Sequence, residues 1–281
     1  SFSAEILLAP RSRQILTMKQ NIIVVSGASS GFGRLTAQKL HESGHTVIGT
    51  SRNPKTEEAF ALLPLDVTSD ESVSDFVSEV QKQHGRIDVL INNAGRSHNS
   101  LLEETTLKDA RVIFEVNFWG MVRMNRAVLP LMREQGNGLV ITVSSLAGLV
   151  GTPGQGFYGA AKHAIEGYSE TLRSELANSP VEVALIEPGF FQTNIKEAMV
   201  RNGEPISDYD DVRDIVSQKL DEGFEDGGDP AEVVAAIEKA IADNGKTFRQ
   251  LVGKDAKTIA RLKRWLPESW FLDGTKKQFG L

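Results

Sequence analysis

The sequence predicts a single-domain α/β fold in which helices cover both faces of a doubly wound parallel sheet. Short runs rich in apolar and β-branched residues predict about seven strands, near residues 21–26, 46–51, 61–65, 87–92, 138–144, 181–187 and 248–252. Segments with helical periodicity separate them, near residues 31–43, 70–84, 106–135, 156–178 and 230–244. Such alternation is typical of parallel strands joined by right-handed crossovers.

The composition agrees with one globular domain and excludes several classes of function. A chain of 281 residues that is 40% hydrophobic can bury one large core, and no repeat or linker divides it. No apolar run approaches the ~20 residues of a membrane-spanning helix. The net charge of −6 argues against nucleic-acid binding. The absence of cysteine and the lack of metal-ligand spacing among five histidines predict no metal, and suit a cytoplasmic protein.

The first predicted strand runs into a glycine-rich turn and then a helix. Ile22 to Val25 are apolar, Gly27, Gly31 and Gly33 follow, and Leu35, Ala37 and Leu40 then recur at helical spacing. Strand, glycine turn and helix in this order are typical of a dinucleotide-binding loop, where the missing Cβ atoms let the backbone approach a pyrophosphate at the helix N-terminus. The alternative is an ordinary glycine turn between a strand and a helix.

Tyr158 and Lys162 lie four residues apart, so they share one face of the predicted helix. A nearby ammonium favours the phenolate and should lower the pKa of Tyr158 towards neutrality, where a tyrosine can exchange a proton with a carbonyl or an alcohol. Ser145, thirteen residues upstream, could hydrogen-bond the same substrate oxygen. A Tyr-x-x-x-Lys pair alone is usually just two neighbours on a helix surface.

Together these motifs resemble the short-chain dehydrogenase/reductase family, from Met18 to about Val252, and imply a Rossmann-like fold. In that resemblance Asn117, Ser145, Tyr158 and Lys162 correspond to the catalytic tetrad, and the family's spacing selects Ser145 over Ser144. It implies that Tyr158 transfers the proton, Ser145 holds the substrate oxygen and Asn117 binds a relay water. Lys162 would lower the pKa of Tyr158 and bind the nicotinamide ribose.

The resemblance also implies a set of cofactor-binding residues. These residues are Gly27, Ser29, Ser30, Gly31, Phe32 and Gly33 in the glycine loop; Ser51 and Arg52 after the second strand; Asp66 and Val67 near the adenine; Asn93, Ala94 and Gly95; and Tyr158, Lys162, Pro188, Gly189 and Thr193 near the nicotinamide. Several of these motifs follow predicted strands. Because ligands bind at the carboxyl ends of strands in such sheets, we expect the motifs to converge on one edge.

The end of the second predicted strand indicates which dinucleotide is used. A carboxylate there would bind the adenosine ribose of NAD and repel a 2′-phosphate, but the chain has Ser51 and Arg52, and no acid between Thr46 and Lys55. A guanidinium can hold a phosphate with two hydrogen bonds, so NADP is predicted in preference to NAD. The alternative is a solvated loop arginine, and Ser30 occupies a glycine-loop position that is basic in many NADP-using relatives.

The segment after Pro188-Gly189 should cover the substrate. Residues 190–228 are polar and long enough to form a lid. The apolar side chains expected around the reacting centre are Phe190, Phe191, Phe157, Leu149 and Met199. They predict a small apolar carbonyl or alcohol as the substrate, although each aromatic could equally belong to the core.

The two ends of the chain differ from the 18–253 catalytic domain. Residues 1–17 precede the first methionine and are interpreted as an N-terminal extension or leader, with a trimmed organelle-targeting remnant as the alternative. Residues 254–281 are basic and predict an amphipathic helix packed on the body, with a membrane-surface or subunit contact as the alternative. The family resemblance implies a homo-oligomer, either a dimer or a tetramer.

The combined interpretation is an NADP(H)-dependent oxidoreductase that interconverts a carbonyl and an alcohol. In the implied reaction, hydride passes between nicotinamide C4 and the carbonyl carbon while Tyr158 supplies the proton. The main alternative is a nonenzymatic NADP-sensing regulator on the same scaffold, which a missing tetrad residue would favour, and none is missing. A sugar-nucleotide epimerase also uses Tyr-x-x-x-Lys but has a larger C-terminal substrate domain than this chain can hold.

Overall fold

The computed structural model describes residues 20–54, 58–193, 199–201 and 203–281, so the predicted extension at residues 1–17 lies outside the described residues. A seven-stranded sheet in the order β3-β2-β1-β4-β5-β6-β7 forms the centre, and all neighbouring strands are parallel. The strands are β1 (Ile22–Val25), β2 (Thr46–Ser51), β3 (Ala61–Pro64), β4 (Val89–Asn92), β5 (Gly138–Val143), β6 (Val181–Pro188) and β7 (Arg249–Val252). The predicted doubly wound parallel fold is confirmed.

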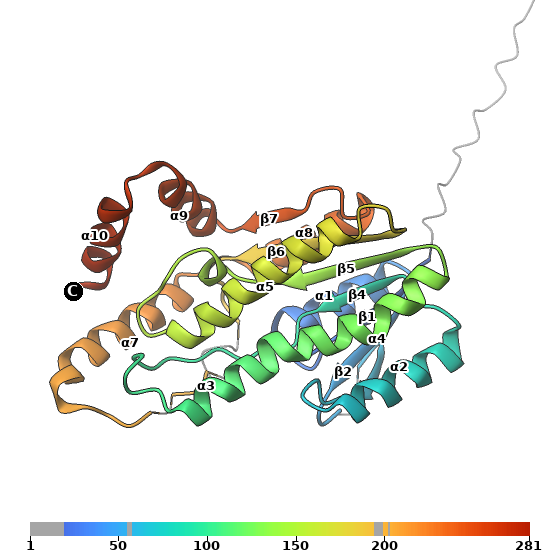
Figure 1. Ribbon diagram of the computed structural model, residues 1–281, viewed down its shortest axis with the longest axis horizontal. Helices are drawn as coiled ribbons and strands as arrows, with labels where there is room; N and C mark the ends of the chain where they lie inside the picture. Colours follow the sequence, from blue (N-terminus) through green and yellow to red (C-terminus); the bar gives the residue numbers. More distant parts are fainter. Residues whose placement is uncertain (1–19, 55–57, 194–198, 202) are drawn as a thin grey trace, which may run out of the picture.

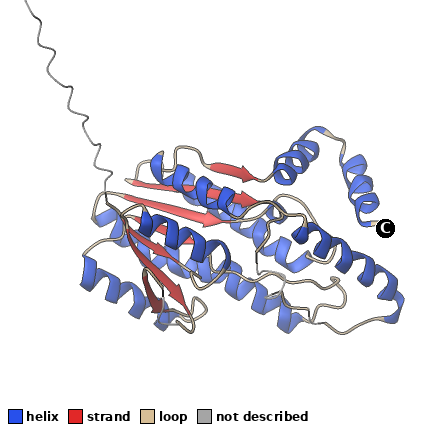
Figure 2. Cartoon of the chain, turned by 180° about the vertical axis from the view of Figure 1, so that it is seen from behind, coloured by secondary structure: helices blue, strands red, loops and turns tan. Residues whose placement is uncertain are grey.

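Helices cover both faces of the sheet, as the two opposite views show (Figure 1, Figure 2). On one face, α1 (Gly31–Glu42) and α8 (Ala231–Ala242) pack on Ile23 and Val25 of β1. On the other face, α2 (Asp70–His84), α4 (Gly120–Glu134) and α5 (Gly156–Glu175) pack around Val24. Because successive residues of β1 enter opposite halves of the core, the strand reads as a continuous apolar run.

The helix predicted over residues 106–135 is interrupted by a π turn. It consists of α3 (Leu107–Phe114), η1 (Glu115–Trp119) and α4. The buried Asn117 side chain lies in the π turn, where its amide donates to the Ile113 carbonyl at 3.0 Å and to the Arg96 carbonyl at 3.1 Å. The side chain therefore occupies the Ile113 carbonyl, which a regular helix would use internally. Its bond to the Arg96 carbonyl connects the π turn to the segment after β4.

The segment after β6 and the C-terminus contain helices beyond the predicted set. The segment that was predicted as a lid carries η3 (Ser207–Tyr209) and α7 (Asp210–Glu225), while the extension forms α9 (Lys254–Trp265) and α10 (Glu268–Phe279). Phe279 of α10 packs against Val216 and Leu220 of α7. A short 3-10 turn, η2 (Leu146–Gly148), links β5 towards α5. Within the described ranges, no helix combines the length and apolarity needed to cross a membrane.

The glycine turn after β1 depends on close backbone contacts. Gly33, the third residue of α1, lies so close to the Gly27 carbonyl and the Asn93 amide that any Cβ would overlap both groups. The Asn93 amide itself donates to the Ser26 and Gly27 carbonyls, each at 3.0 Å. A side chain at position 33 must therefore open the turn.

We expect Gly33→Ala to lower the free energy of unfolding by about 1–3 kcal/mol, because overpacking at this contact forces the turn apart. Urea denaturation followed by circular dichroism measures the change. Gly167→Ala is the matched control, since a Cβ at position 167 meets no atom within 4 Å. An unchanged midpoint for Gly33→Ala would contradict the close-contact account.

Candidate active site

Two connected depressions lie at the carboxyl edge of the sheet. The longer cleft is lined by most of the predicted cofactor-binding residues: Gly27, Ser29, Ser30, Gly31, Phe32, Ser51, Arg52, Asp66, Val67, Asn93, Ala94, Gly95, Tyr158, Lys162 and Thr193. Pro188 and Gly189 instead line the adjoining pocket, and Gly33 lies beneath the loop. Tyr158 borders both depressions, so the structure places the predicted proton-transfer residue where they meet.

The glycine loop presents backbone groups at the start of α1. Gly27 and Gly31 have φ angles of +68° and +53°, a region that glycine adopts without strain. Ser30 occupies the N-cap position without a side-chain cap bond, so the first turn of the helix offers its N–H groups to an anion. These features fit a bound pyrophosphate.

Ser26 is a structural residue of this cleft that the sequence analysis missed. Its hydroxyl accepts hydrogen bonds from the backbone N–H groups of Asn93 and Ala94, both at 3.0 Å, and donates to the Ile91 carbonyl at 3.3 Å. It thereby joins the turn after β1 to the turn after β4. A polar residue between a buried apolar strand and the first glycine was the signal available in the sequence.

The far end of the cleft carries both basic and acidic groups. Arg52 is exposed just beyond β2, where Ser51 accepts a hydrogen bond from the Asn53 N–H at 3.3 Å. Hydrogen bonds from Thr68 hold the pKa of Asp66 below its ordinary value, and the charge of Arg52 contributes in the same direction. Arg34, the other basic residue near the loop, forms an ion pair with Glu58 at 3.0 Å.

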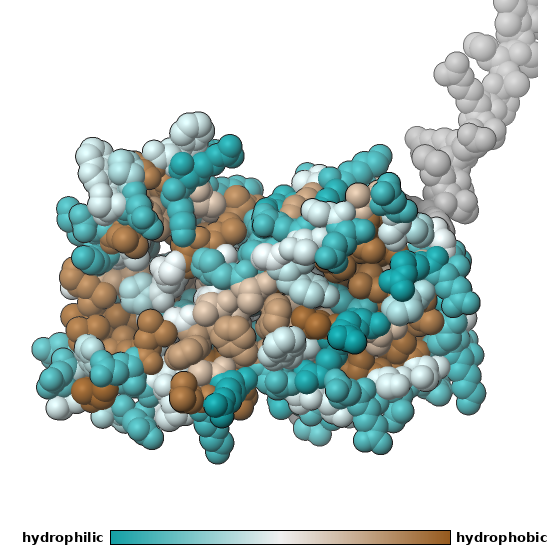
Figure 3. All heavy atoms as spheres, in the orientation of Figure 1, coloured by the Kyte–Doolittle hydropathy of each residue, from teal (hydrophilic) through white to brown (hydrophobic). Residues whose placement is uncertain are grey.

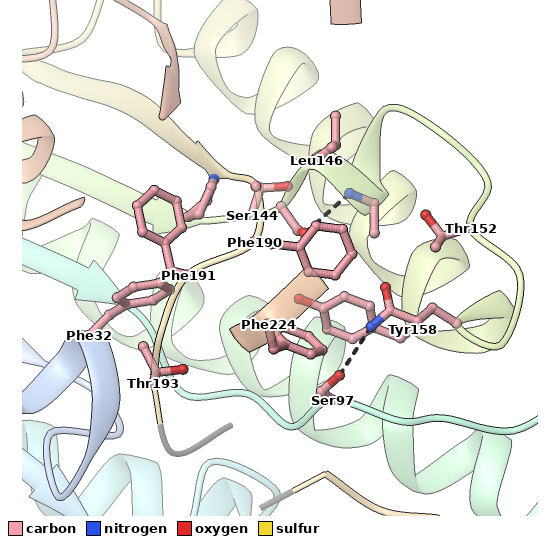
Figure 4. A pocket seen from close by; sticks show the side chains of 15 residues that line it. Phe32, Ser97, Ser144, Leu146, Thr152, Tyr158, Phe190, Phe191, Thr193 and Phe224 are labelled. Atoms are coloured by element: carbon pink, nitrogen blue, oxygen red, sulfur yellow. Dashed lines mark hydrogen bonds between the residues drawn. The ribbon is translucent and has the colours of Figure 1, made fainter. Parts of the chain in front are cut away.

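Ser145 and Tyr158 both line the smaller pocket, and Figure 4 shows the Tyr158 ring between Phe190 and Ser97. Ser145 caps η2, with its hydroxyl oxygen accepting from the Ala147 N–H at 3.1 Å. Tyr158 lies in the first turn of α5. Burial raises the pKa of the phenol, and a hydrogen bond with Ser145 partly opposes that effect.

Lys162 lies one turn further along α5 and is 6% exposed. Its ammonium donates to the Val143 carbonyl at the end of β5 at 2.8 Å, and its Nζ is 5.7 Å from the centroid of the Tyr158 ring. Burial lowers the pKa of Lys162 to about 8, while the charge of Glu166 acts in the opposite direction.

The expected lowering of the Tyr158 pKa by Lys162 is not seen. The largest effect on the phenol is burial, which disfavours the phenolate and moves its pKa upward. The ammonium is directed to the Val143 carbonyl, and burial also weakens its own charged form. The sequence showed that the two residues share a helix face but did not show how deeply both are buried.

Asn117 fixes the chain that follows β4. Its side-chain oxygen accepts from the Arg96 N–H at 3.0 Å, and its amide donates to the Arg96 carbonyl at 3.1 Å. Gly95 lies so close that a Cβ there would be 2.6 Å from the Asn117 oxygen. The structure thus gives Asn117 a role in shaping the cleft wall, and its expected role with a relay water stays a prediction.

The smaller pocket has aromatic and polar walls. Phe190 and Phe224 meet edge to face at 5.0 Å between ring centroids, and Phe32 and Phe191 do so at 5.7 Å (Figure 4). Ser97, Thr152 and Gln155 provide polar groups, and the Gln155 amide donates to the Ser97 hydroxyl at 3.4 Å. The pocket therefore has an aromatic side and a hydrogen-bonding side.

The predicted substrate residues divide into two groups. Phe190 and Phe191 line this pocket, although Phe191 is also part of the sheet core. Leu149, Phe157 and Met199 do not line the pocket. Leu149 packs towards Ala256 of α9. Met199 is buried, and the next residue, Val200, forms a β-bridge with His98. Their closeness in sequence to Ser145, Tyr158 or Phe190 did not show in which direction these side chains point.

Phe224 and Asp255 are further contributors that the sequence analysis missed. Phe224 comes from α7, which the polar composition of its segment concealed. Asp255 of α9 accepts a hydrogen bond from the Phe190 N–H at 2.7 Å, so the C-terminal extension holds the turn that carries the pocket wall. No group of three or more His, Asp or Glu residues within the described part of the chain could hold a metal ion.

Comparisons with known proteins agree with this geometry. The family model described as short chain dehydrogenase matches residues 21–203. A 3-ketodihydrosphingosine reductase from Bacteroides thetaiotaomicron is 41% identical over 261 residues, covering 90% of this chain and 95% of that protein.

Solved structures show the same relationship. A short-chain dehydrogenase from Streptomyces avermitilis has a TM-score of 0.78 and 34% identity, covering 92% of this chain and all of that chain. A serine dehydrogenase in complex with NADP⁺ has a TM-score of 0.67 and 27% identity, covering 78% of this chain and 88% of that chain. The chain belongs to the short-chain dehydrogenase/reductase family and is an NAD(P)-dependent oxidoreductase acting on CH–OH groups.

Proposed function

We propose that this chain is an NADP(H)-dependent reductase of apolar ketones or aldehydes, which can also oxidise the corresponding alcohols. The observation that carries the proposal is the position of Tyr158, which borders both the glycine-loop cleft and the aromatic pocket and has Ser145 and Lys162 beside it. A dinucleotide in the cleft and a carbonyl in the pocket would meet at this phenol.

The chain's own groups are suited to proton transfer at the substrate oxygen. When bound, the dinucleotide supplies or accepts the hydride. Tyr158 gives its phenolic proton to the oxygen of the carbonyl, and the Ser145 hydroxyl holds that oxygen by a hydrogen bond. Because burial raises the pKa of Tyr158, the phenol is protonated at neutral pH, which favours carbonyl reduction.

The preference for NADP is proposed from the end of β2. Ser51 and Arg52 line the cleft there, and Arg52 is exposed at the position where a ribose 2′-phosphate is expected. A guanidinium can bind this phosphate through two charge-assisted hydrogen bonds. Arg34 has Glu58 as its partner, so Arg52 is the better candidate for this contact.

The substrate proposal rests on the two walls of the pocket. Phe190 and Phe224 offer an apolar surface, and Ser97 with Gln155 offers hydrogen-bonding groups near Tyr158. The relative named as a 3-ketodihydrosphingosine reductase indicates a long-chain ketone. We therefore infer a carbonyl that carries a long apolar chain, which the aromatic wall would contact.

We infer that the protein forms a homo-oligomer. Leu107 of α3 and Trp119 of η1 expose large apolar side chains. A second group of apolar side chains lies over α7 and α10, where Ile215 and Leu272 are exposed (Figure 3). Large exposed apolar side chains gathered on a helix face are typical of protein contacts, so both surfaces are candidates for contact with another copy.

Tyr158→Phe tests the enzymatic function against the alternative of a nonenzymatic NADP-sensing regulator. We expect kcat to fall by ~10²–10⁴-fold, because the proton donor is lost, while NADPH still binds through the glycine loop. Consumption of NADPH measured by absorbance and binding measured by calorimetry separate the two effects. Tyr209→Phe is the control, since the half-buried Tyr209 lies outside both depressions and is bonded to Glu103. Near-normal turnover by Tyr158→Phe would overturn the assignment.

Cofactor preference is tested by changing Ser51 and Arg52 together. The unmodified chain should favour NADPH over NADH in kcat/KM, by roughly ten- to a hundredfold if one charge-assisted contact is responsible. Ser51→Asp with Arg52→Leu should reverse the order, because a carboxylate binds the free ribose and repels the phosphate. Arg34→Leu serves as the control and should leave the preference in place. Equal use of both cofactors by the unmodified chain would argue against Arg52 as the phosphate ligand.

Substrate class is tested with a panel of carbonyl compounds assayed with NADPH. The panel contains 3-ketodihydrosphingosine, octadecan-3-one, cyclohexanone, retinal and propanal. Phe190→Ala and Phe224→Ala should lower kcat/KM for the two long-chain ketones more than for propanal, because only a long chain reaches the aromatic wall. Trp270→Ala, an exposed aromatic on α10, is the control. Equal losses on all carbonyls would exclude a chain-binding role for this wall.

A further inference from the structure

A buried cluster of charged side chains lies behind Lys162, on the side of α5 that packs against the sheet. Glu166 follows Lys162 by one helical turn, Glu187 is the penultimate residue of β6, and Arg249 begins β7. Glu166 is 6% exposed and Glu187 is 1% exposed. The proton-transfer chemistry described above gives none of these three residues a role.

Arg249 is surrounded by carboxyl groups. Its Nε lies 3.0 Å from Glu187, one terminal nitrogen lies 2.9 Å from Glu166, and the other lies 2.7 Å from Glu170. Three carboxylates around one guanidinium would leave excess negative charge, and Glu166 and Glu187 are buried where such charge is costly. A proton shared between the two buried carboxyls removes this excess.

The surroundings of Glu187 favour its neutral form. Burial and the neighbouring charge of Glu166 raise the pKa of Glu187 to about 8, and the two side chains are hydrogen-bonded to each other. Glu166 has two contacts with Arg249 and the opposite charge of Lys162 on its own helix.

The charge of Glu166 acts on Lys162. Burial favours the neutral amine of Lys162, and the Glu166 carboxylate opposes it by favouring the ammonium. On the same helix, Tyr158 is the other titratable side chain beside the lysine. Strand β5 contributes the neutral Val143 carbonyl, and the π turn contributes Asn117 to the same cleft.

We propose that Glu166 is a positioning residue that keeps Lys162 in its ammonium form, and that Glu187 carries the proton which allows Glu166 to stay ionised. The proposal deepens the proposed function and rests on it, since the site uses this ammonium beside Tyr158. Arg249 connects the pair to β7, so three elements of the fold contribute to the charge state of one lysine.

The direct test is the titration of Lys162 in the full-length protein, observed by NMR after labelling lysine at Cε and assigned with Lys162→Met. Glu166→Gln should lower the titration midpoint by about one pH unit or more, because the favourable charge is lost. Glu187→Gln should leave the Lys162 midpoint close to its value in the unmodified chain, since glutamine imitates the neutral acid. Glu170→Gln is the matched control on the same helix and arginine.

Enzyme kinetics supply the second readout. In Glu166→Gln the alkaline limb of kcat/KM should move to lower pH by the same amount, with activity retained on the acid side of that limb. A merely structural role would lower activity at every pH without moving the limb. If Glu166→Gln does not fold, Glu166→Asp retains the charge at a greater distance and should give a smaller shift in the same direction.

Two results would overturn the proposal. One is a Lys162 midpoint that does not respond to Glu166→Gln or Glu166→Asp, and the other is a shift in Glu187→Gln as large as that in Glu166→Gln. The NMR titration needs neither substrate nor cofactor. Absence of NADPH-dependent turnover by the unmodified chain would therefore count against the proposed function alone, and the titration would still decide the role of Glu166.

Discussion

The hydrogen bond from the Lys162 ammonium to the Val143 carbonyl, at 2.8 Å, is the interaction on which the site depends. A charged amine at 6% exposure is costly unless strong acceptors and an opposite charge compensate for its lost water. The carbonyl is available because β5 ends at Val143, and the opposite charge comes from Glu166 on the next turn of α5. With the lysine held in this way, Tyr158 is fixed on the same helix face, next to Ser145 after the same strand.

The parallel sheet brings the remaining parts of the site to the same edge. Four central strands end beside one another, so the turns after β1, β4, β5 and β6 supply the glycine loop, Asn93, Ser145 and Pro188 without long connections. The turns after β1 and β4 approach each other closely, since a Cβ at Gly27 would be 2.8 Å from the Cα of Ala94. The C-terminal extension completes the arrangement, because Asp255 holds the Phe190 N–H and so fixes one wall of the pocket.

Most of the fold could be predicted from the sequence, because strands and helices depend on local patterns. The family's motif spacing selected the four tetrad positions, and their catalytic roles stay predictions. Strands such as β4 and β5 are buried on both faces and therefore appear as largely apolar runs. The π turn at Asn117 could not be predicted, since helical periodicity continues through it and the Asn117 side chain bonds Arg96, which is distant in sequence. Helix α7 was missed because its segment is polar and its buried residues, Val216 and Leu220, face α10. The pKa of Tyr158 depends on burial, which spacing does not reveal.

Burial shifts the pKa values of the Tyr158 phenol and the Lys162 ammonium in opposite directions. As a result, the Tyr158 phenol carries a proton that it can donate. The phenol of Tyr158 keeps its proton more firmly, while the ammonium of Lys162 releases its own more readily, with a pKa of about 8. An uncharged lysine would give no electrostatic support to the phenolate that proton donation leaves behind. The Glu166 carboxylate counteracts this loss, but it can do so only while Glu187 remains neutral, because two ionised carboxyls beside one arginine would carry excess buried charge. Proton transfer at Tyr158 is therefore coupled to residues on β6 and β7 that never reach the pocket.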